Sequence, residues 1–126
     1  MPKLVPPVPS GVTPLGPYST VTEAAGLVFV SGQVAIDPAT GSRVDGDVGV
    51  QAARIMDNLG GILGDLGLGY DDIVKTTIFL DDMADFPVVN EVYGGYFPAA
   101  PPARSTVEVG ALPGGFLVEI EVIAAR

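Results

Sequence analysis

The chain has 126 residues, with fifteen acidic residues against six Lys and Arg, and its net charge is −9. A surface with this charge repels a phosphate backbone, so nucleic acid is a poor candidate partner. The sequence contains neither Cys nor His, which excludes disulfides, thiolate nucleophiles, the usual zinc sites and a Ser-His-Asp triad.

The length and the even composition predict a single domain over residues 1–126. Hydrophobic residues make up 48% of the chain and the mean hydropathy is +0.44. A small domain leaves much of this apolar surface exposed, so we expect self-association. No apolar run approaches the roughly 20 residues of a membrane helix, and the start of the chain has no leader-like pattern. A cytoplasmic location is the default expectation.

Residues 5–17 are too rich in Pro and Gly for regular structure, although a short edge strand fits beside them. The next segment, "LVFVSGQVAI" (27–36), is β-branched, aromatic and almost continuously apolar. It predicts a strand that is buried on both faces and interrupted near Ser31-Gly32.

Between residues 48 and 66 the apolar side chains recur at steps of three and four. This period predicts an amphipathic helix, with Asp47 as its N-cap and Gly67 at its end. The following segment, "DIVKTTIFL" (72–80), has the composition of a strand.

The segment "DDMADF" then offers Asp82 or Asp85 as the cap of a second helix, with Pro87 in the first turn, where proline is tolerated. The apolar stripe of this helix consists of Val89, Val92, Tyr93, Tyr96 and Phe97.

Two strands, 104–109 and 116–124, follow a proline-rich connector. The loop "GALPGG" between them is typical of a hairpin, so we expect the two strands to pair antiparallel. The order of strands, helix, strand, helix and two strands predicts an α/β sandwich in which the helices cover one face of the sheet.

With that pairing, one face of the sheet gathers Arg104, Thr106, Glu108, Glu119 and Glu121. The simplest interpretation is a half-exposed sheet with a cross-strand ion pair of small net value. The expected self-association favours another interpretation, because a second subunit over this face would make the cluster a partly dry pocket. There the guanidinium would match the two oxygens of a carboxylate ligand, and a glutamate would position or deprotonate water. Such a pair suits hydrolysis of a small α-substituted acid.

Five segments in series resemble the RidA/YjgF family of reactive-intermediate imine deaminases: "GPYS" (16–19), "VSGQVAIDPATG" (30–41), "IVKTTIFLDDMADFPVVNEVY" (73–93), "PARSTVEV" (102–109) and "VEIEVIA" (118–124). The resemblance implies a chorismate-mutase-like fold and a homotrimer, with a central barrel of sheets, helices outside and clefts between subunits. It also implies hydrolysis of 2-imino acids, such as 2-iminopropanoate and 2-iminobutanoate, to 2-oxo acids and ammonia.

The same resemblance implies that Arg104 holds the substrate carboxylate and that Glu119, the first Glu of "VEIE", orients or activates the water. The implied substrate-binding positions are Tyr18, Ser31, Gly32 through its backbone, Asn90 and Thr106. Plain structural roles are open for several of them: a core-edge aromatic for Tyr18, a β-bulge for Ser31-Gly32 and an exposed helix position for Asn90.

Many members of the family have cysteine where this chain has Thr106, so functions that need a reactive thiol should be absent. The deaminase interpretation requires that this position contribute mainly its backbone carbonyl. A protonated imine carbon is already electrophilic, so a positioned water and a fixed carboxylate can suffice. We therefore expect neither a metal nor a cofactor.

The alternative function is a non-catalytic binder or sensor of small 2-oxo or other carboxylic acids, which would use the same cleft. The endoribonuclease activity attached to some family members fits poorly with the acidic charge and the absence of His.

Overall fold

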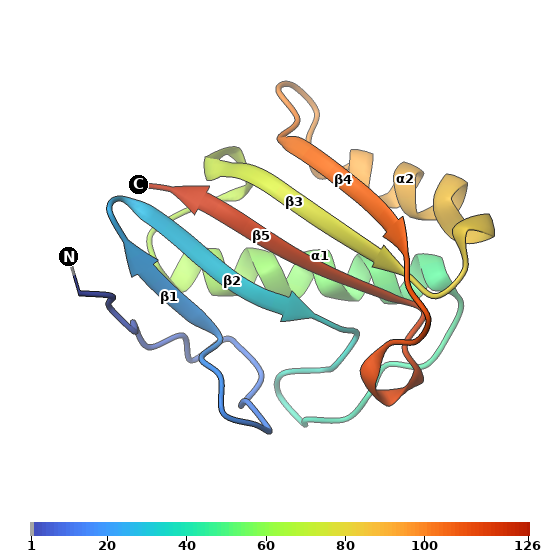
Figure 1. The fold of residues 1–126 in the computed structure, drawn as a ribbon, viewed down its shortest axis with the longest axis horizontal. Coiled ribbons are helices and arrows are strands. Elements are labelled where there is room, and N and C mark those ends of the chain that lie inside the picture. The colour runs from blue at the N-terminus through green and yellow to red at the C-terminus, as the bar shows by residue number, and fades with distance from the viewer. Residues whose placement is uncertain (1) are drawn as a thin grey trace.

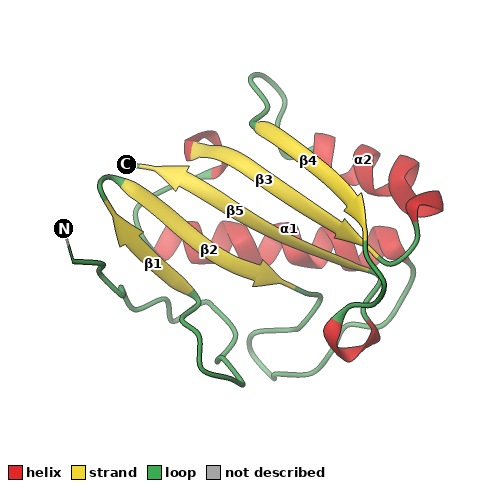
Figure 2. Ribbon diagram, viewed as in Figure 1, coloured by secondary structure: helices red, strands yellow, loops and turns green. Residues whose placement is uncertain are grey.

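The computed structural model describes residues 2–126. Its strands and α-helices are β1 (Val21–Ala24), β2 (Leu27–Gln33), α1 (Val48–Asp65), β3 (Ile73–Leu80), α2 (Phe86–Gly94), β4 (Ala103–Glu108) and β5 (Val118–Ala125). The strands form one mixed sheet in the order β1-β2-β5-β3-β4, and both helices lie behind it (Figure 1). Coloured by element type, Figure 2 shows the same two layers. The predicted sandwich with helices on one face is confirmed.

The core lies between the sheet and the helices. It is built from alternate residues of the strands and from the inner faces of α1 and α2, and its fully buried members include Val28, Ile55, Leu59, Ile62, Leu63, Ile78, Leu80, Val89, Val118 and Ile120. Each such side chain contributes about 1.5–3 kcal/mol relative to an exposed one. The helices therefore attach firmly to one face of the sheet only.

The pairing of the last two strands differs from the predicted hairpin, which was wrong. β4 is an edge strand parallel to β3, with Arg104 opposite Thr76 and Thr106 opposite Ile78. β5 lies between β2 and β3 and is antiparallel to both. The physical reason is burial: β5 buries every second residue against the helices, whereas β4 buries none. The more apolar strand takes the central position, and the "GALPGG" loop carries the chain past β3 to reach it.

The predicted helix caps are largely confirmed. The side chain of Asp47 accepts a hydrogen bond from the Val50 N–H at 2.9 Å, and Gly67 follows the last turn of α1 with a φ of +74°. Asp82 caps a short helical turn before α2, while Asp85 makes no side-chain cap bond. Pro87 lies in the first turn of α2, as expected.

The other face of the sheet, which Figure 1 views, has no second layer among residues 2–126. On β2, Val28 and Val30 are buried toward the helices, whereas Leu27 and Phe29 are 37% and 39% exposed. The expectation that this strand is buried on both faces is therefore wrong for a single chain. The predicted interruption is confirmed, because the register with β5 shifts between Val30 and Gln33.

The N-cap gives a direct test of how α1 begins. Replacement Asp47→Ala removes the acceptor for the Val50 N–H, so we expect the free energy of unfolding to fall by about 1 kcal/mol. The measurement is urea denaturation at one fixed protein concentration, because association adds to apparent stability. Asp47→Asn is the matched control, since asparagine also caps helices. Equal losses in both variants would contradict the role of the cap.

Candidate functional site

Most of the residues singled out in the sequence line one of two open clefts of about 450 Å³ each. The first, here called the Arg104 cleft, is lined by Asn90, Tyr93, Gly94, Phe97, Pro101, Pro102 and Arg104. The second, here called the Glu119 cleft, is lined by Tyr18, Ser31, Gly32, Val34, Pro113, Glu119 and Glu121. The chain therefore presents two separate sets of polar groups.

Arg104 belongs to the edge strand β4, and residues on one face of α2 orient its side chain. Its Nη1 donates a hydrogen bond to Oδ1 of Asn90 at 2.8 Å. Its guanidinium carbon lies 5.4 Å from the ring centre of Phe86 and 5.2 Å from that of Tyr93. Spacings of four and three residues bring these three helix positions to the same side of α2. Asn90, one of the substrate-binding positions that the resemblance implies, thus lines the same cleft as Arg104 and contacts it directly.

Below Arg104, the ring of Tyr93 is fixed by a buried hydrogen bond of 2.8 Å between its hydroxyl and Oγ1 of Thr76. Burial raises the pKa of Tyr93 above its ordinary value of 10.0, so the phenol stays neutral at physiological pH. Within residues 2–126, Arg104 forms no ion pair with a carboxylate. Its remaining donors are available to an anionic ligand, because a guanidinium carries five N–H groups.

Thr106 lies two residues along β4 from Arg104, on the same face of the strand. It does not line the Arg104 cleft. Its Oγ1 is buried and has no hydrogen-bond partner among residues 2–126. A buried unpaired hydroxyl costs free energy, so this position is a polar site that the single chain leaves unsatisfied.

Glu119 projects from the central strand β5 toward the open face, because Val118 and Ile120 on either side of it are buried toward the helices. Burial and the like charge of Glu121 raise the pKa of the Glu119 carboxyl above its ordinary value of 4.5. Gly32 lies directly against the carboxylate, and a methyl group on its Cα would overlap the carboxylate oxygen. A larger residue at position 32 would therefore displace the Glu119 carboxylate from this position.

Ser31 connects the Tyr18 segment to β2. Its Oγ donates to the carbonyl oxygen of Ser19 at 2.6 Å, and its N–H donates to the carbonyl of Thr20 at 2.9 Å. These bonds place the half-exposed Tyr18 at the Glu119 cleft. The β-bulge and the cleft position, which were alternatives for Ser31-Gly32 in the sequence, are both present.

Arg104 and Glu119 do not lie on one face of the sheet, and the predicted cluster was wrong. Arg104 neighbours Thr76 on the helix side, and Glu119 neighbours Phe79 on the open side. Strand β3 separates β4 from β5, and the two side chains point to opposite faces.

The expected cross-strand ion pair between Arg104 and the two glutamates of β5 is consequently absent from the described chain. Glu108, predicted on the same polar face, instead accepts a hydrogen bond from the Met83 N–H at 2.8 Å. Each charged group of the proposed site thus faces a cleft with no counter-charge of its own.

Several residues of the clefts, and Phe86 beside Arg104, were not recognised from the sequence. Phe86 was not singled out, and Tyr93 was assigned only to the apolar stripe. Their spacing from Asn90 was the available signal, because it is the spacing of one helix face. Glu121 was interpreted only as part of a solvated or salt-bridged polar face, yet it lines the Glu119 cleft, and so does Pro113. No local pattern indicated Pro113, since its place depends on the course of a long loop.

No group of three or more potential metal-ligating side chains is found among residues 2–126. No helix in this part of the chain is long and apolar enough to cross a membrane.

The profile of the endoribonuclease L-PSP family matches residues 9–126. Protein DfrA from Myxococcus xanthus is 53% identical over 112 residues, which are 87% of this chain and 86% of that protein. The 2-iminobutanoate/2-iminopropanoate deaminase of Mus musculus is 45% identical over 89% of this chain and 83% of its own length. The chloroplastic Reactive Intermediate Deaminase A of Arabidopsis thaliana is 50% identical over 87% of this chain and 59% of its own length.

Solved structures show the same similarity. The Rid family protein YyfA from Yersinia pestis superposes with a TM-score of 0.94 and 42% identity, over 99% of this chain and 100% of that one. The yjgF gene product of E. coli superposes with a TM-score of 0.87 and 40% identity, over 94% of each chain.

The two carboxyl groups of the Glu119 cleft give a test of its electrostatics. In Glu121→Gln, the like charge that disfavours ionised Glu119 is lost, so the pKa of Glu119 should fall toward its ordinary value. At a given pH above 4.5 a larger fraction of Glu119 is then ionised. The measurement is a carbon-13 NMR titration of the Glu119 carboxyl.

Glu108→Gln is the control for this titration, because it also removes one negative charge but retains an acceptor for Met83. Glu119 should titrate in this variant as in the unaltered protein. An unchanged midpoint in Glu121→Gln, or an equal shift in the control, would contradict the coupling.

Proposed function

Since this chain belongs to the endoribonuclease L-PSP family, that of the RidA and YjgF proteins, we propose that it hydrolyses reactive 2-imino acids to 2-oxo acids and ammonia. The observation that carries the proposal is Arg104, a guanidinium that is fixed by Asn90 and two aromatic rings, faces an open cleft and has no carboxylate partner within the described chain. Two relatives named as deaminases of this chemistry support it.

Arg104 would bind the carboxylate of the substrate. Its planar fork offers two parallel N–H donors, which match the two oxygens of a carboxylate. Asn90 occupies Nη1, and the rings of Phe86 and Tyr93 restrict the plane of the guanidinium. Less ordering entropy is then lost when the substrate binds, which favours affinity for a small anion.

Glu119 would handle the water. As the water oxygen forms a bond to the imine carbon, the C=N electron pair moves to nitrogen and the Glu119 carboxylate takes a proton from the water. The resulting carbinolamine then loses ammonia: Glu119 returns the proton to the leaving nitrogen as the C–N bond breaks, and C=O forms as the hydroxyl proton passes to the regenerated carboxylate. A carboxyl with a raised pKa is suited to give the proton back, because the best acid–base catalyst has a pKa near the working pH.

We further propose that the site is completed between copies of the chain. One chain directs Arg104 to the helix side of the edge strand and Glu119 to the open face. The open face also carries the exposed side chains of Leu27, Phe29 and Val107, and an apolar surface of this kind favours association. A homotrimer in which the Arg104 cleft of one subunit meets the Glu119 cleft of the next would bring the two groups together.

A ribonuclease activity, which the family description names, is less well supported. The net charge of −9 opposes binding of a phosphate backbone. The chain also has no His to serve as the acid–base group. Small carboxylic acids carry a single charge and suit one fixed arginine better than a polyanion does.

The activity is tested with imines generated in place by a serine or threonine dehydratase and trapped as semicarbazones. The unaltered protein should accelerate loss of the imine. Arg104→Ala removes the two charge-assisted hydrogen bonds to the carboxylate, worth about 1.5–3 kcal/mol each, so kcat/KM should fall by at least about a hundredfold. Glu119→Gln should lower kcat by about a hundredfold or more.

The same assay separates the alternatives. Thermal stabilisation by 2-oxo acids without any turnover would identify a binder or sensor and overturn the deaminase proposal. Full activity in Arg104→Ala would overturn the role of the carboxylate anchor. Glu108→Gln serves as the control, because Glu108 lies outside both clefts.

The placement of the site between subunits is tested by complementation. Arg104→Ala and Glu119→Gln chains, each with strongly reduced activity alone, are co-expressed with different tags, and the mixed oligomers are isolated. In every trimer that contains both kinds of chain, one of the three interfaces regains both groups, so activity should return to about a third of the unaltered level. No recovery in mixed oligomers would show that both groups act from one chain.

A further inference from the structure

The loop from Gly110 to Leu117 joins the two functional strands, since β4 carries Arg104 and β5 carries Glu119. It includes a short helical turn, η3 (Pro113–Gly115), and Pro113 lines the Glu119 cleft. Gly114 and Gly115 adopt φ values of +78° and +70°, which glycine reaches at little cost but which leave the loop flexible when it is not held. The position of the Pro113 wall therefore depends on what contacts this loop.

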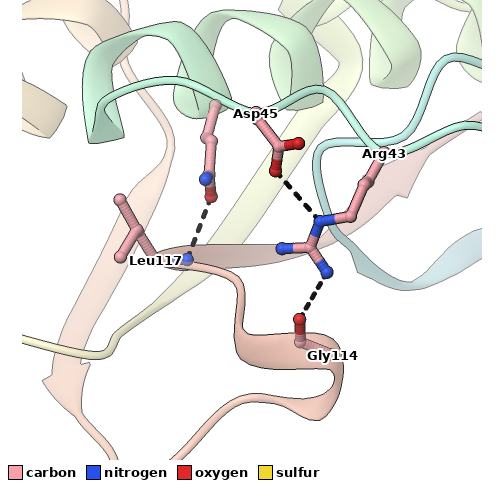
Figure 3. Close-up of polar contacts among 5 residues, drawn as sticks. Arg43, Asp45, Gly114 and Leu117 are labelled. Carbon is pink, nitrogen blue, oxygen red and sulfur yellow. Dashed lines mark hydrogen bonds and ion pairs between the residues drawn. The ribbon is translucent and has the colours of Figure 1, made fainter.

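Arg43, which is remote from the loop in the sequence, contacts the loop at Gly114, as Figure 3 shows. Its Nη1 donates a hydrogen bond to the carbonyl oxygen of Gly114. Its guanidinium carbon lies 4.1 Å from the ring centre of the buried Phe116. Its Nε donates to Oδ1 of Asp45 at 3.1 Å, in an ion pair. The Arg43 side chain thus contacts the loop at two points, the backbone carbonyl of Gly114 in η3 and the ring of Phe116.

The segment that carries Arg43 is itself firmly attached beside the Glu119 cleft. Arg43 forms a backbone bridge with Ile36, and the Val44 N–H donates to the carbonyl of Ala35 at 2.8 Å. Val34, just before this pair, lines the same cleft. Arg43 therefore links two walls of the cleft, one at Val34 and one at Pro113.

The far end of the loop has an anchor of its own. The buried side chain of Gln51, on α1, accepts a hydrogen bond from the Leu117 N–H at 2.9 Å. This bond fixes the entry into β5 and hence the backbone of Glu119. Loss of Arg43 would free the part of the loop that holds Pro113 while β5 stays in place.

We propose that Arg43 is a positioning residue that fixes Pro113 as a rigid wall of the Glu119 cleft, and that this wall limits the size of the substrate side chain. The limit on substrate size rests on the proposed imine hydrolysis. The fixing of the loop does not, because it is a property of the contacts between Arg43, Gly114 and Phe116.

The experiment compares Arg43→Ala with Arg126→Ala. Arg126 is a close match: its side chain is 44% exposed against 42% for Arg43, and each pairs with a carboxylate and donates to a backbone carbonyl. Arg126 contacts Glu23 and Leu66 and lines neither the Arg104 cleft nor the Glu119 cleft. The control therefore reproduces the loss of one exposed arginine without touching the loop.

Two readouts are taken on the full chain. The first is the ratio of kcat/KM for 2-iminopropanoate to that for the imine of a bulky amino acid, generated by an amino-acid oxidase. A rigid wall that excludes a few methylene groups is expected to discriminate by at least about tenfold. Arg43→Ala should lose most of this ratio, mainly through a lower KM for the bulky imine, and Arg126→Ala should retain it. The second readout is amide hydrogen exchange, which should accelerate in residues 110–116 of Arg43→Ala but not in β5.

Each outcome decides one point. A retained ratio in an active Arg43→Ala protein, or equal losses in both variants, overturns the role in specificity. Unchanged exchange in residues 110–116 overturns the fixing of the loop. If the unaltered protein hydrolyses no imine, the proposed function and the size limit both fail, and faster exchange confined to the loop still supports the positioning of Pro113.

Discussion

The central position of β5 is the constraint on which the rest of the structure depends. Its alternate residues Val118, Ile120 and Val122 are buried against the helices, and the strand is paired along both edges. Alternation along a strand then forces Glu119 and Glu121 onto the opposite, open face. The same arrangement moves β4 to the edge of the sheet, where Arg104 contacts α2.

This separation has an electrostatic consequence. A guanidinium and a carboxylate within one chain, in contact, would satisfy each other and leave little for a ligand. Here Arg104 is matched with a neutral amide and two aromatic rings, while Glu119 forms no ion pair among residues 2–126 and has the like charge of Glu121 nearby. Both groups therefore keep their capacity to bind a ligand.

Local features could be predicted from the sequence, and features of long-range pairing could not. The extent of α1 follows from the steps of its apolar residues and from Asp47 and Gly67, which all act within one helix. The position of β5 does not follow from local pattern, because adjacent strands in sequence usually pair and the "GALPGG" loop resembles a hairpin loop. Its true neighbours depend on which strand buries more apolar surface.

The site follows the same division. Arg104, Asn90 and Glu119 were identified singly, by motif, and Arg104 and Asn90 do contact each other. Their grouping failed for Glu119, since a single error in strand order reverses which groups share a face. The contact of Arg43 with Phe116 joins two loops that are remote in sequence. No periodicity or capping rule reports such a contact.

The hydrogen bond from Ser31 to Ser19 determines which hydrogen-bonding groups Ser31 can offer in the Glu119 cleft. A hydroxyl has one hydrogen, and that of Ser31 is directed to the carbonyl oxygen of Ser19. Toward the cleft, Ser31 can offer only lone pairs. A protonated imine nitrogen carries N–H groups that can meet them, whereas the oxygen of a ketone has no hydrogen to give. In the proposed hydrolysis, the Ser31 hydroxyl would therefore favour the protonated imine over the 2-oxo product and so favour departure of the product.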